Sequence, residues 1–541
     1  RELLATLARL LRRHDPDILL TDWGDSFLLP RLLDAARRTH CPLPLNRDPE
    51  AAARHRPARS YFSYGRIVFK DSTTTLAGRL HLDRKNSFVV GETDLEGLFE
   101  LARLTQLPLQ YMARTSTGTG ITSMQLAAAC RRGILIPWQK REPEEFKTGE
   151  QLLRTDRGGL VFQPVLGFHE NVGELDFASM FPAIMARFNV SPETVNCRCG
   201  CPERVPEIGY RLCQKRRGLV PQVVEPLIEK RRRYKRLKRA ATNEADCRRY
   251  HRRQDALKWM LVTCFGYLGY KNARFGRIEA HEAINAFGRD RLLQAKELAE
   301  GAGFRLLHAI VDSLWVHKDG ATQEDYTVLA RAIEQATGLP IDLAGVYKFI
   351  VFLPSRQDPS VPVPNRYFGA FAGTDEIKVR GLEARRHDAP PLIARMQEEV
   401  LVLLAEAHDA ASYRRKLEEA RQVLHRYRER LQDGKVAWEE LVIRKRLTQH
   451  PEDYRRASLV AVAAQSLAAR GVKLRPGEVI DYVITQADAA VPCERARPFT
   501  LLSNFHGYDR RKYLELLEDA FTPFQFYFPP LPSLLRGQPA E

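Results

Sequence analysis

The spacing of apolar and polar positions predicts a chain in which helices and short strands follow one another. Apolar residues that recur every three or four positions indicate helices, and short apolar runs bounded by turn residues indicate strands. These patterns predict a helix over 2–13, a turn and strand over 15–23, a strand, turn and helix over 171–186, helices over 214–241 and about 246–265, two short strands over 304–318, and helices from 391 to about 433. The Pro-rich tail, residues 529–541, is predicted to be a loop or a flexible segment.

Two of these predicted helices would form a basic antiparallel pair. Residues 228–253, which span the connection between them, hold twelve Lys or Arg among 26 residues. The residues that share one face of a helix are Arg231 and Lys235 on the first, and Lys258, Val262 and Phe265 on the second. A solvated basic surface is the usual role of such a charge run, so alone it indicates an attraction to polyanions.

Composition limits the class of protein. A chain of 541 residues is too long for one hydrophobic core, and we expect three to five domains or subdomains. The 84 Lys and Arg exceed the 67 Asp and Glu by 17, which favours nucleic acid as a partner first and an anionic membrane second. No uninterrupted apolar stretch is long enough to span a bilayer, and the nine cysteines suggest reduced thiols in a cytoplasmic protein. Because the first residue is Arg1, we expect the numbering to start inside a longer protein.

Two aspartates stand near the ends of predicted strands. Asp176 lies in ELDFASM, and Asp312 lies in the apolar run HAIVDSLWV, where an ionised carboxylate is costly unless it is paired or binds a metal. Brought together by the fold, the two would bind a pair of divalent ions about 3.5–4 Å apart, which clamps the oxygens of a phosphoryl transfer. Magnesium suits oxygen ligands and phosphates. For two isolated aspartates, a role in a turn or a helix cap is the favoured alternative.

The cysteines cluster in one place. Cys197, Cys199 and Cys201 are followed by Cys213, and four thiolates bind zinc tetrahedrally. The spacing Cys-x-Cys-x-Cys-x₁₁-Cys differs from the usual paired Cys-x-x-Cys, so free thiols in a loop are an equally supported interpretation.

The order and the residues of these segments resemble those of the sequence motifs of family-B DNA polymerases. The segments that carry the resemblance are LDFASMFPAIMARFNVSPET (175–194) for the first palm motif, LKWMLVTCFGYLG (257–269) for the fingers motif, AIVDS (309–313) for the second palm motif, NRYFGAFAGTDEIKVRGLEARRHDAP (365–390) for the segment that grips the duplex, LVIRKRLTQHPEDY (441–454) and GEVIDYVIT (477–485) for the thumb, and HDPDILLTDWGDSFLLPRL (14–32) for a degraded part of the proofreading exonuclease. Four ordered motifs make the resemblance specific.

The resemblance implies an α+β multidomain fold, a right-hand polymerase of palm, fingers and thumb with a degenerate RNase H-like exonuclease domain. The implied domains are a partial exonuclease-like domain at 1–115, the first part of the palm at 116–195, fingers at 196–270, the second part of the palm at 271–390 and the thumb at 391–541. The implied activity is template-directed DNA synthesis with two Mg²⁺ ions, for which Mn²⁺ substitutes. The implied partners are primer-template DNA, deoxynucleoside triphosphates and a processivity or repair partner, with no membrane, in the cytoplasm with the nucleoid.

The resemblance also assigns roles to residues. Asp176 and Asp312, with the carbonyl of Phe177, would hold the metal ions. The implied nucleotide-binding residues are Ser179, Met180, Phe181, Arg231, Lys258, Val262 and Phe265, and the implied DNA-binding residues are Arg366, Tyr367, Lys378, Arg380, Arg385 and Arg386. The ring of Phe181 would clash with a 2′-hydroxyl and so exclude ribonucleotides.

Departures from the family pattern qualify the implied activity. Ile310 stands where the family has an accessory Asp, Val262 where it has Asn, and Asn365 where it has the Lys that grips the primer. This set resembles a divergent branch first noted among archaeal paralogues. A DNA-binding scaffold that has lost catalysis is therefore the alternative, but drift in a dead enzyme would be expected to strike Asp176 and Asp312 as readily as accessory positions, which favours activity.

The exonuclease motif is more strongly altered. The family's Asn and Asp fall on Trp23 and Leu28, and a two-metal nuclease cannot run with Leu in place of a carboxylate ligand. A nuclease is thus the third and weakest interpretation, and we expect Asp83 and Asp94 to have a surface role. The sequence predicts no proofreading, and with Val262 it suggests low fidelity or lesion bypass.

Overall fold

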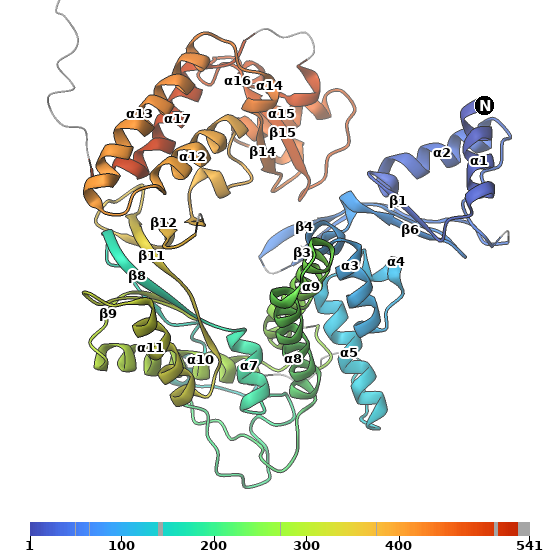
Figure 1. Cartoon of the computed structure of the whole chain (residues 1–541). Coiled ribbons are helices and arrows are strands. Elements are labelled where there is room, and N and C mark those ends of the chain that lie inside the picture. The colour runs from blue at the N-terminus through green and yellow to red at the C-terminus, as the bar shows by residue number, and fades with distance from the viewer. Residues whose placement is uncertain are drawn as a thin grey trace, which may run out of the picture.

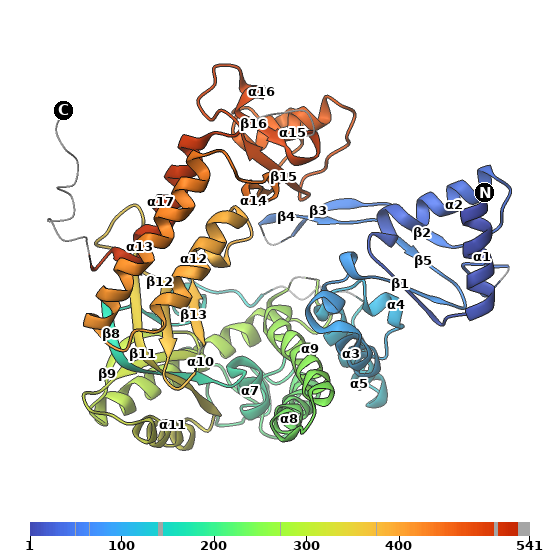
Figure 2. The ribbon, with the colours of Figure 1, turned by 45° about the horizontal axis from the view of Figure 1, so that its top comes forward.

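The computed structural model describes residues 1–48, 50–63, 65–138, 144–270, 272–374, 376–502 and 507–528, so the predicted loop at 529–541 lies outside the described residues. In Figures 1 and 2 the N-terminal part lies at one end, two long helices of the middle of the chain stand beside a sheet, and the C-terminal helices stand over the other end of that sheet. Of the helices in the described ranges, none combines the length and the apolar character that crossing a bilayer would need.

An antiparallel sheet of seven strands carries the two aspartates. Its strands are β7 (Val161–Phe162), β8 (Gly167–Phe177), β9 (Arg305–Ile310), β10 (Ser313–His317), β11 (Ile341–Pro354), β12 (Pro362–Phe371) and β13 (Ile377–Arg380). They pair in the order β13-β12-β11-β8-β10-β9-β7. The sequence-adjacent hairpin β9–β10 therefore sits beside β8, although about 130 residues separate them along the chain.

The alternation of side chains along β8 decides which face carries the site. Leu175 and Phe177 are buried in the core that the sheet shares with its helices, which are α7 (Met180–Arg187), α10 (Ile278–Gly301) and α11 (Gln323–Thr337). Because successive side chains of a strand point to opposite faces, Glu174 and Asp176 face the other way. The same alternation holds in β10, where Leu314 joins the helix side.

The two basic helices form the pair that the sequence predicts. They are α8 (Leu219–Ala240) and α9 (Glu244–Gly269). The side chain of Asn243, between them, accepts a hydrogen bond from the backbone amide of Asp246 and so caps α9. The further helices α3 (Phe88–Thr105) and α5 (Thr117–Arg131) pack against α9, and Thr117 Oγ1 lies 2.6 Å from Thr263 Oγ1. A segment that the domain prediction gives to the palm thus packs on the fingers helices.

The C-terminal part has a hydrophobic core of its own. Its elements are α12 (Pro391–Leu404), α13 (Ala410–Gln432), α14 (Trp438–Leu441), β14 (Ile443–Arg446), α15 (Leu459–Ala468), β15 (Val479–Ile484), α16 (Pro492–Arg495), β16 (Ala496–Pro498) and α17 (Arg510–Gln525). The helices α12, α13 and α17 pack together and stand over one end of the seven-stranded sheet, as Figure 1 shows. Buried Tyr413 donates its hydroxyl to the carbonyl of Phe524 at 2.9 Å, which ties α13 to α17.

The N-terminal part contains small sheets and helices. Its elements are α1 (Glu2–His14), β1 (Ile18–Thr21), α2 (Leu29–Arg38), β2 (Arg54–Arg56), β3 (Arg59–Ser63), β4 (Arg66–Lys70), β5 (Thr73–Thr75), β6 (Leu80–Asp83), α4 (Leu109–Met112) and, after α5, α6 (Gly149–Thr155). Strand β1 pairs with β6 in parallel. The β3–β4 hairpin reaches the C-terminal part, where Ser60 Oγ donates to the carbonyl of Pro476 at 2.6 Å.

A buried ion pair holds the N-terminal part together. Asp25 is fully buried, and both of its oxygens accept from the guanidinium of Arg114, from Nε and from Nη2, at 2.9 Å. The backbone amide of Thr74 and the side-chain amide of Asn86 each donate to this carboxylate as well, at 2.8 Å. The charge of Asp25 is thereby neutralised and its hydrogen-bonding capacity is filled, which a buried carboxylate requires.

The structure confirms the predicted elements except at one end: the helix predicted over 214–241 begins only at Leu219, and residues 214–218 belong to the preceding loop. Helix 2–13 is α1, the strand after it is β1, and the strand, turn and helix over 171–186 are the end of β8 followed by α7. The two short strands over 304–318 are β9 and β10, joined at Val311-Asp312. The helical stretch after Pro391 is α12 and α13.

Replacing Arg114 tests the role of the buried pair. We expect Arg114→Ala to lower the free energy of local unfolding in the N-terminal part by about 3–5 kcal/mol, because it leaves an uncompensated buried charge. Hydrogen exchange of β1 and β6 measures this local opening. Arg84→Ala, which breaks the exposed pair with Asp22, is the matched control and should leave the exchange of these strands nearly unchanged. Equal effects of the two substitutions would contradict the assigned role of Asp25.

Candidate active site

Asp176 and Asp312 line one cavity of about 390 Å³. Asp176 is the penultimate residue of β8, and Asp312 lies in the turn between β9 and β10. The residues that line the cavity with them include all seven predicted nucleotide-binding positions: Ser179, Met180, Phe181, Arg231, Lys258, Val262 and Phe265. The fold therefore brings together three segments that lie far apart in the sequence.

Strand register places the two aspartates side by side. Ser313 pairs with Asp176 across β10 and β8, and its hydroxyl donates to Asp176 Oδ1 at 2.6 Å. The amide of Phe177 donates to the carbonyl of Asp312 at 2.8 Å. Val311 completes the turn with φ +55°, a conformation that is strained for a β-branched residue, and its amide is held by the carbonyl of Leu160 at 3.0 Å.

Burial raises the proton affinity of both carboxylates. Burial, and then the charge of Asp176, raise the pKa of Asp312 to about 6. Burial also raises the pKa of Asp176, against the hydrogen bond from Ser313, which lowers it. Two buried like charges of this kind need a positive counter-charge to remain ionised near neutral pH. Oxygen donors that lack a counter-charge fit a hard divalent cation.

A third carboxylate, Asp342, lines the same cavity and was not singled out from the sequence. It lies on β11 directly opposite Asp176, and its Oδ2 is 3.7 Å from Lys235 Nζ. The oxygens of these three carboxylates do not all lie within 4.8 Å of one another. Within the described ranges, the group of three possible metal ligands that meets this limit consists of cysteines. The segment that contains Asp342 has no motif, and only the pairing of β11 with β8 reveals the position.

Cationic side chains from α8 and α9 face the carboxylates. Arg231 of α8 donates from Nη1 to Ser179 Oγ at 2.7 Å. Burial lowers the pKa of Arg231, and the charges of Asp255 and Asp176 raise it. Burial likewise lowers the pKa of Lys235. Lys258 of α9 is exposed. The cavity thus has an acidic wall from the sheet and a basic wall from the helices.

An aromatic stack lies beside this basic wall. The rings of Phe181 and Phe265 have centroids 4.2 Å apart, and Phe265 stacks in turn on His281 at 4.2 Å. A Cβ at Gly288 would lie 3.1 Å from the Phe181 ring, so the absence of a side chain there makes room for that ring. His281 was not recognised from the sequence, because histidines in a helix of this composition carry no distinctive signal. Val262 is 59% exposed.

The predicted duplex-binding residues divide into two groups. Arg380, Arg385 and Arg386 are exposed, and Arg386 pairs with Asp388 at 2.9 Å. Tyr367 is only 3% exposed and packs on Trp315, so the expectation that it touches duplex phosphates is wrong for this structure. The alternation along β12 turns its side chain into the core, a choice that the motif alone does not specify.

Two further cations of that motif are engaged within the protein. Lys378 forms an ion pair with buried Glu174, and Arg366 donates to the carbonyl of Pro354. Glu174 also accepts the hydroxyl of Tyr347 at 2.6 Å. The duplex contacts expected of Lys378 and Arg366 stay predictions, because each would have to give up or share an internal bond.

The altered exonuclease positions are on the surface. Trp23 is 55% exposed and Leu28 is 38% exposed. Asp94 is exposed, as the sequence analysis expects. The expected surface role is wrong for Asp83, whose side chain is buried, with 2% exposed. Its carboxylate accepts hydrogen bonds from the backbone amides of Trp23 and Asp25, at 3.1 and 2.9 Å. Its place at the end of β6, beside the π-helical turn Gly24–Leu28, explains the burial.

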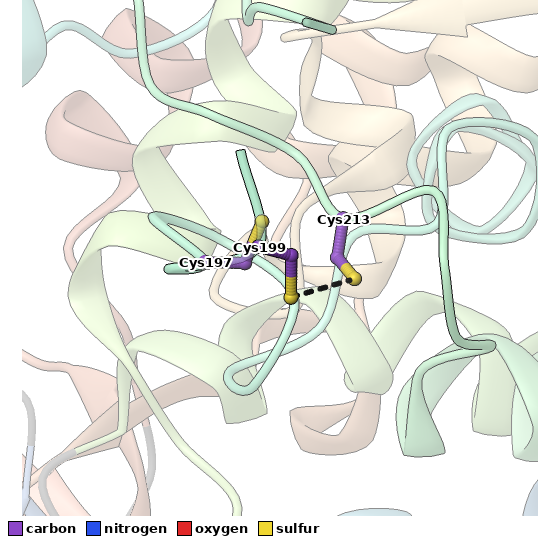
Figure 3. A group of neighbouring side chains, drawn as sticks. All are labelled: Cys197, Cys199 and Cys213. Carbon is purple, nitrogen blue, oxygen red and sulfur yellow. Dashed lines mark hydrogen bonds between the residues drawn. The ribbon is translucent and has the colours of Figure 1, made fainter. Parts of the chain in front are cut away.

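Three of the four cysteines meet in one group, which Figure 3 shows. The Sγ atoms of Cys197, Cys199 and Cys213 all lie within 4.8 Å of one another. Cys201 belongs to the same buried cluster, and its Sγ accepts the amide of Gln214 at 3.3 Å. The arrangement leaves both zinc binding and free thiols as interpretations of this loop.

Comparisons with known proteins agree with the geometry. A family model described as DNA polymerase family B matches residues 107–328 and 363–521. A DNA polymerase of Archaeoglobus fulgidus is 28% identical over 560 residues, and the match covers 94% of this chain and 67% of that protein. "DNA polymerase 2" of Saccharolobus solfataricus is 30% identical over 356 residues, with 66% of this chain and 51% of that protein covered.

The fold has a solved counterpart. The family B DNA polymerase of Pyrobaculum calidifontis superposes with a TM-score of 0.67 at 23% identity, and the match covers 97% of this chain and 72% of that chain. This likeness supports the right-hand architecture that the resemblance implies. Because the family model spans more than half of the chain, including both aspartates and the basic helix pair, the chain belongs to DNA polymerase family B and is a DNA-directed DNA polymerase.

Proposed function

We propose that the chain adds deoxynucleotides to a primer 3′-hydroxyl by two-metal phosphoryl transfer at the cavity of Asp176 and Asp312. The observation that carries the proposal is the cavity itself, in which the partly buried Asp176 and Asp312 on the sheet face cationic side chains on two helices. Phosphoryl transfer requires little covalent chemistry from a protein and depends on positioning and on charge stabilisation. Both requirements are met by residues that line this one space.

The donor set fits divalent cations. Asp176, Asp312 and the carbonyl of Phe177 would hold two Mg²⁺ ions, with Mn²⁺ as a substitute. The chemistry that such ions supply when bound is a lower pKa for the primer hydroxyl and neutralisation of the leaving pyrophosphate. Ser313 keeps one oxygen of Asp176 oriented through its hydrogen bond. Ile310, which replaces an accessory carboxylate, lowers the negative charge of the site without removing either aspartate.

The basic wall would bind the triphosphate. Arg231 is preorganised by Ser179, and Lys258 extends from α9 into the same cavity. Amides at the start of α7 would add donors, since helix N-termini favour phosphate. The amide of Ala178 does not contribute, because it already donates to the carbonyl of Pro340 at 2.8 Å. The donors left for phosphate are those of Ser179, Met180 and Phe181.

The aromatic stack would select the sugar. Phe181 packs against Phe265 on one side and lies close to Gly288 on another, so the ring cannot move aside easily. A 2′-hydroxyl added to the nucleotide would meet this ring. The stack therefore favours deoxyribonucleotides over ribonucleotides.

The N-terminal part would not proofread. The two buried carboxylates of its β1–β6 region, Asp25 and Asp83, are already saturated by Arg114 and by backbone amides. A metal ligand needs free lone pairs, and a guanidinium held against Asp25 repels a cation. Leu28 removes a further ligand. These carboxylates stabilise the fold and leave no nuclease site in this region of the described chain.

Low fidelity and lesion bypass are proposed from the exposed part of α9 that lines the cavity. Val262 is exposed in the cavity wall and cannot form a hydrogen bond to the nascent base pair. A looser grip tolerates misshapen pairs, and without proofreading the errors persist. Assignment to the divergent archaeal-type branch is proposed from the altered motif positions Ile310, Val262 and Asn365. The alternative of an inactive scaffold has Ile310 and Asn365 in its favour, but it leaves the paired Asp176 and Asp312 without a role.

Primer extension tests the catalytic assignment. We expect Asp176→Ala and Asp312→Ala each to lower the extension rate by a factor of at least about 100, because several kcal/mol of charge stabilisation is lost. Asp319→Ala, at a fully exposed position, is the matched control and should retain the wild-type rate. The rate is measured with Mg²⁺ and with Mn²⁺. Activity that survives both site substitutions would show that the site is wrong.

Fidelity assays test the lesion-bypass role. We expect misinsertion well above that of a replicative enzyme, extension past an abasic template position, and no release of nucleotide from a mismatched primer end. Single-nucleotide incorporation and primer degradation are followed on gels. Rare misinsertion together with a complete block at abasic sites would contradict the proposal.

Salt dependence tests the duplex surface. Phosphate contacts release counter-ions, so affinity for primer-template should fall linearly in a plot of log K against log salt. Arg380→Ala should reduce the slope by about 1, since one phosphate contact is lost. Arg9→Ala, on α1 and remote from the palm, is the control and should leave the slope unchanged. Fluorescence anisotropy measures the affinity, and binding that ignores salt would overturn the assigned surface.

A further inference from the structure

The loop between α7 and α8, residues 188–218, carries the four clustered cysteines. It links the helix that follows Asp176 to the helix that carries Arg231, so its shape sets how the palm meets the fingers. Two antiparallel bridges, Val195 with Leu212 and Arg204 with Arg211, fold the loop back on itself. The amide of Cys213 also donates to the carbonyl of Thr194 at 2.9 Å. These bonds bring Cys213 to the Cys197–Cys201 turn.

The sulfur positions fit tetrahedral metal binding. With Zn–S bonds of about 2.3 Å, tetrahedral geometry places neighbouring sulfurs about 3.8 Å apart. Cys199 Sγ and Cys213 Sγ are 3.9 Å apart, and Cys197 Sγ completes a triangle within 4.8 Å (Figure 3). A disulfide would require about 2.05 Å between two of these atoms. The group is therefore spaced for a shared ion.

The fourth thiol is at hand. Cys201 is 4% exposed and lies in the same cluster as the other three. Gly200, with φ +68°, allows the tight turn that returns Cys201 toward the group. The amide of Gln214 donates to Cys201 Sγ, which stabilises a thiolate at that position.

The surrounding charge suits a four-thiolate site. Zn²⁺ with four thiolates carries a net charge of −2, which nearby cationic side chains would offset. Arg198, Arg204, Lys215 and Arg216 are exposed around the cluster. Arg204 Nη1 donates to the carbonyl of Cys201 at 2.8 Å, which brings one of these cations next to the sulfurs.

We propose that Cys197, Cys199, Cys201 and Cys213 bind one structural Zn²⁺ that holds the palm-to-fingers loop in shape. Asn189 transmits this constraint to α8, because its side chain bonds the carbonyl of Cys213 and the amide of Gly218, both at 2.8 Å. Tyr210 anchors the far side of the loop through its hydroxyl to Glu282 of α10 at 2.8 Å. The ion thus acts away from the catalytic cavity, and its presence is independent of the proposed polymerase mechanism.

Metal analysis of the purified chain tests the proposal. The chain is expressed with zinc in the medium and purified without chelators, and one Zn²⁺ per chain is expected by mass spectrometry of the metal. Replacement by Co²⁺ should give the intense near-ultraviolet absorption of thiolate-to-cobalt charge transfer. Cys201→Ser and Cys213→Ser should each weaken zinc binding at least tenfold. Cys130→Ser and Cys493→Ser, at exposed cysteines, are matched controls and should leave it unchanged.

Thiol titration in denaturant separates the remaining outcomes. Nine reactive thiols after zinc release would agree with the proposal. Nine thiols with no zinc bound and no cobalt absorption would overturn it in favour of free cysteines. Two fewer thiols, with no metal, would overturn it in favour of a disulfide. The cobalt spectrum of the unaltered chain decides the matter even where a cysteine variant fails to fold, and Cys201→Ser that binds zinc normally would overturn the fourth ligand.

Discussion

The antiparallel pairing of β8 with β10 is the constraint on which the site depends. It sets Asp176 opposite Ser313, so that Asp312 in the adjoining turn lies next to it. Because side chains alternate along a strand, a slip of one residue would turn Asp176 into the hydrophobic core and Leu175 toward the cavity. The buried side chains on the helix side of the sheet prevent such a slip. Apolar packing on one face thus determines the position of charge on the other.

Opposite charges on the sheet and on the helices define the cavity between them. Asp176, Asp312 and Asp342 would repel one another, and burial increases that repulsion. Arg231 and Lys258 project toward them from α8 and α9. Neither wall has its charge fully compensated on its own side of the cavity. The space between the walls therefore suits a ligand that combines divalent cations with phosphates. A basic charge run that is normally solvated gains a specific role through this juxtaposition.

The N-terminal part shows how a buried carboxylate is accommodated in a fold. Asp25 accepts four hydrogen bonds within the protein, two of them from Arg114. A buried carboxylate saturated in this way contributes to the packing of β1 and β6 and has no lone pair free for a cation. In the seven-stranded sheet, by contrast, Asp176 and Asp312 are only partly buried, and Asp176 accepts a hydrogen bond from Ser313. The same residue type therefore has a structural role at Asp25 and the proposed catalytic role at Asp176 and Asp312.

The sequence by itself determined the secondary-structure elements, the family and the choice of the two aspartates as candidate metal ligands, because local periodicity and short motifs are enough to predict these. It could not reveal Asp342, whose position opposite Asp176 arises from pairing between β11 and β8. It also could not show that Tyr367 and Asp83 are buried, because the sequence of each segment does not specify whether the side chain points into the core or toward solvent. Only the tertiary structure decided these points, because burial and proximity between distant segments depend on how strands and helices pack.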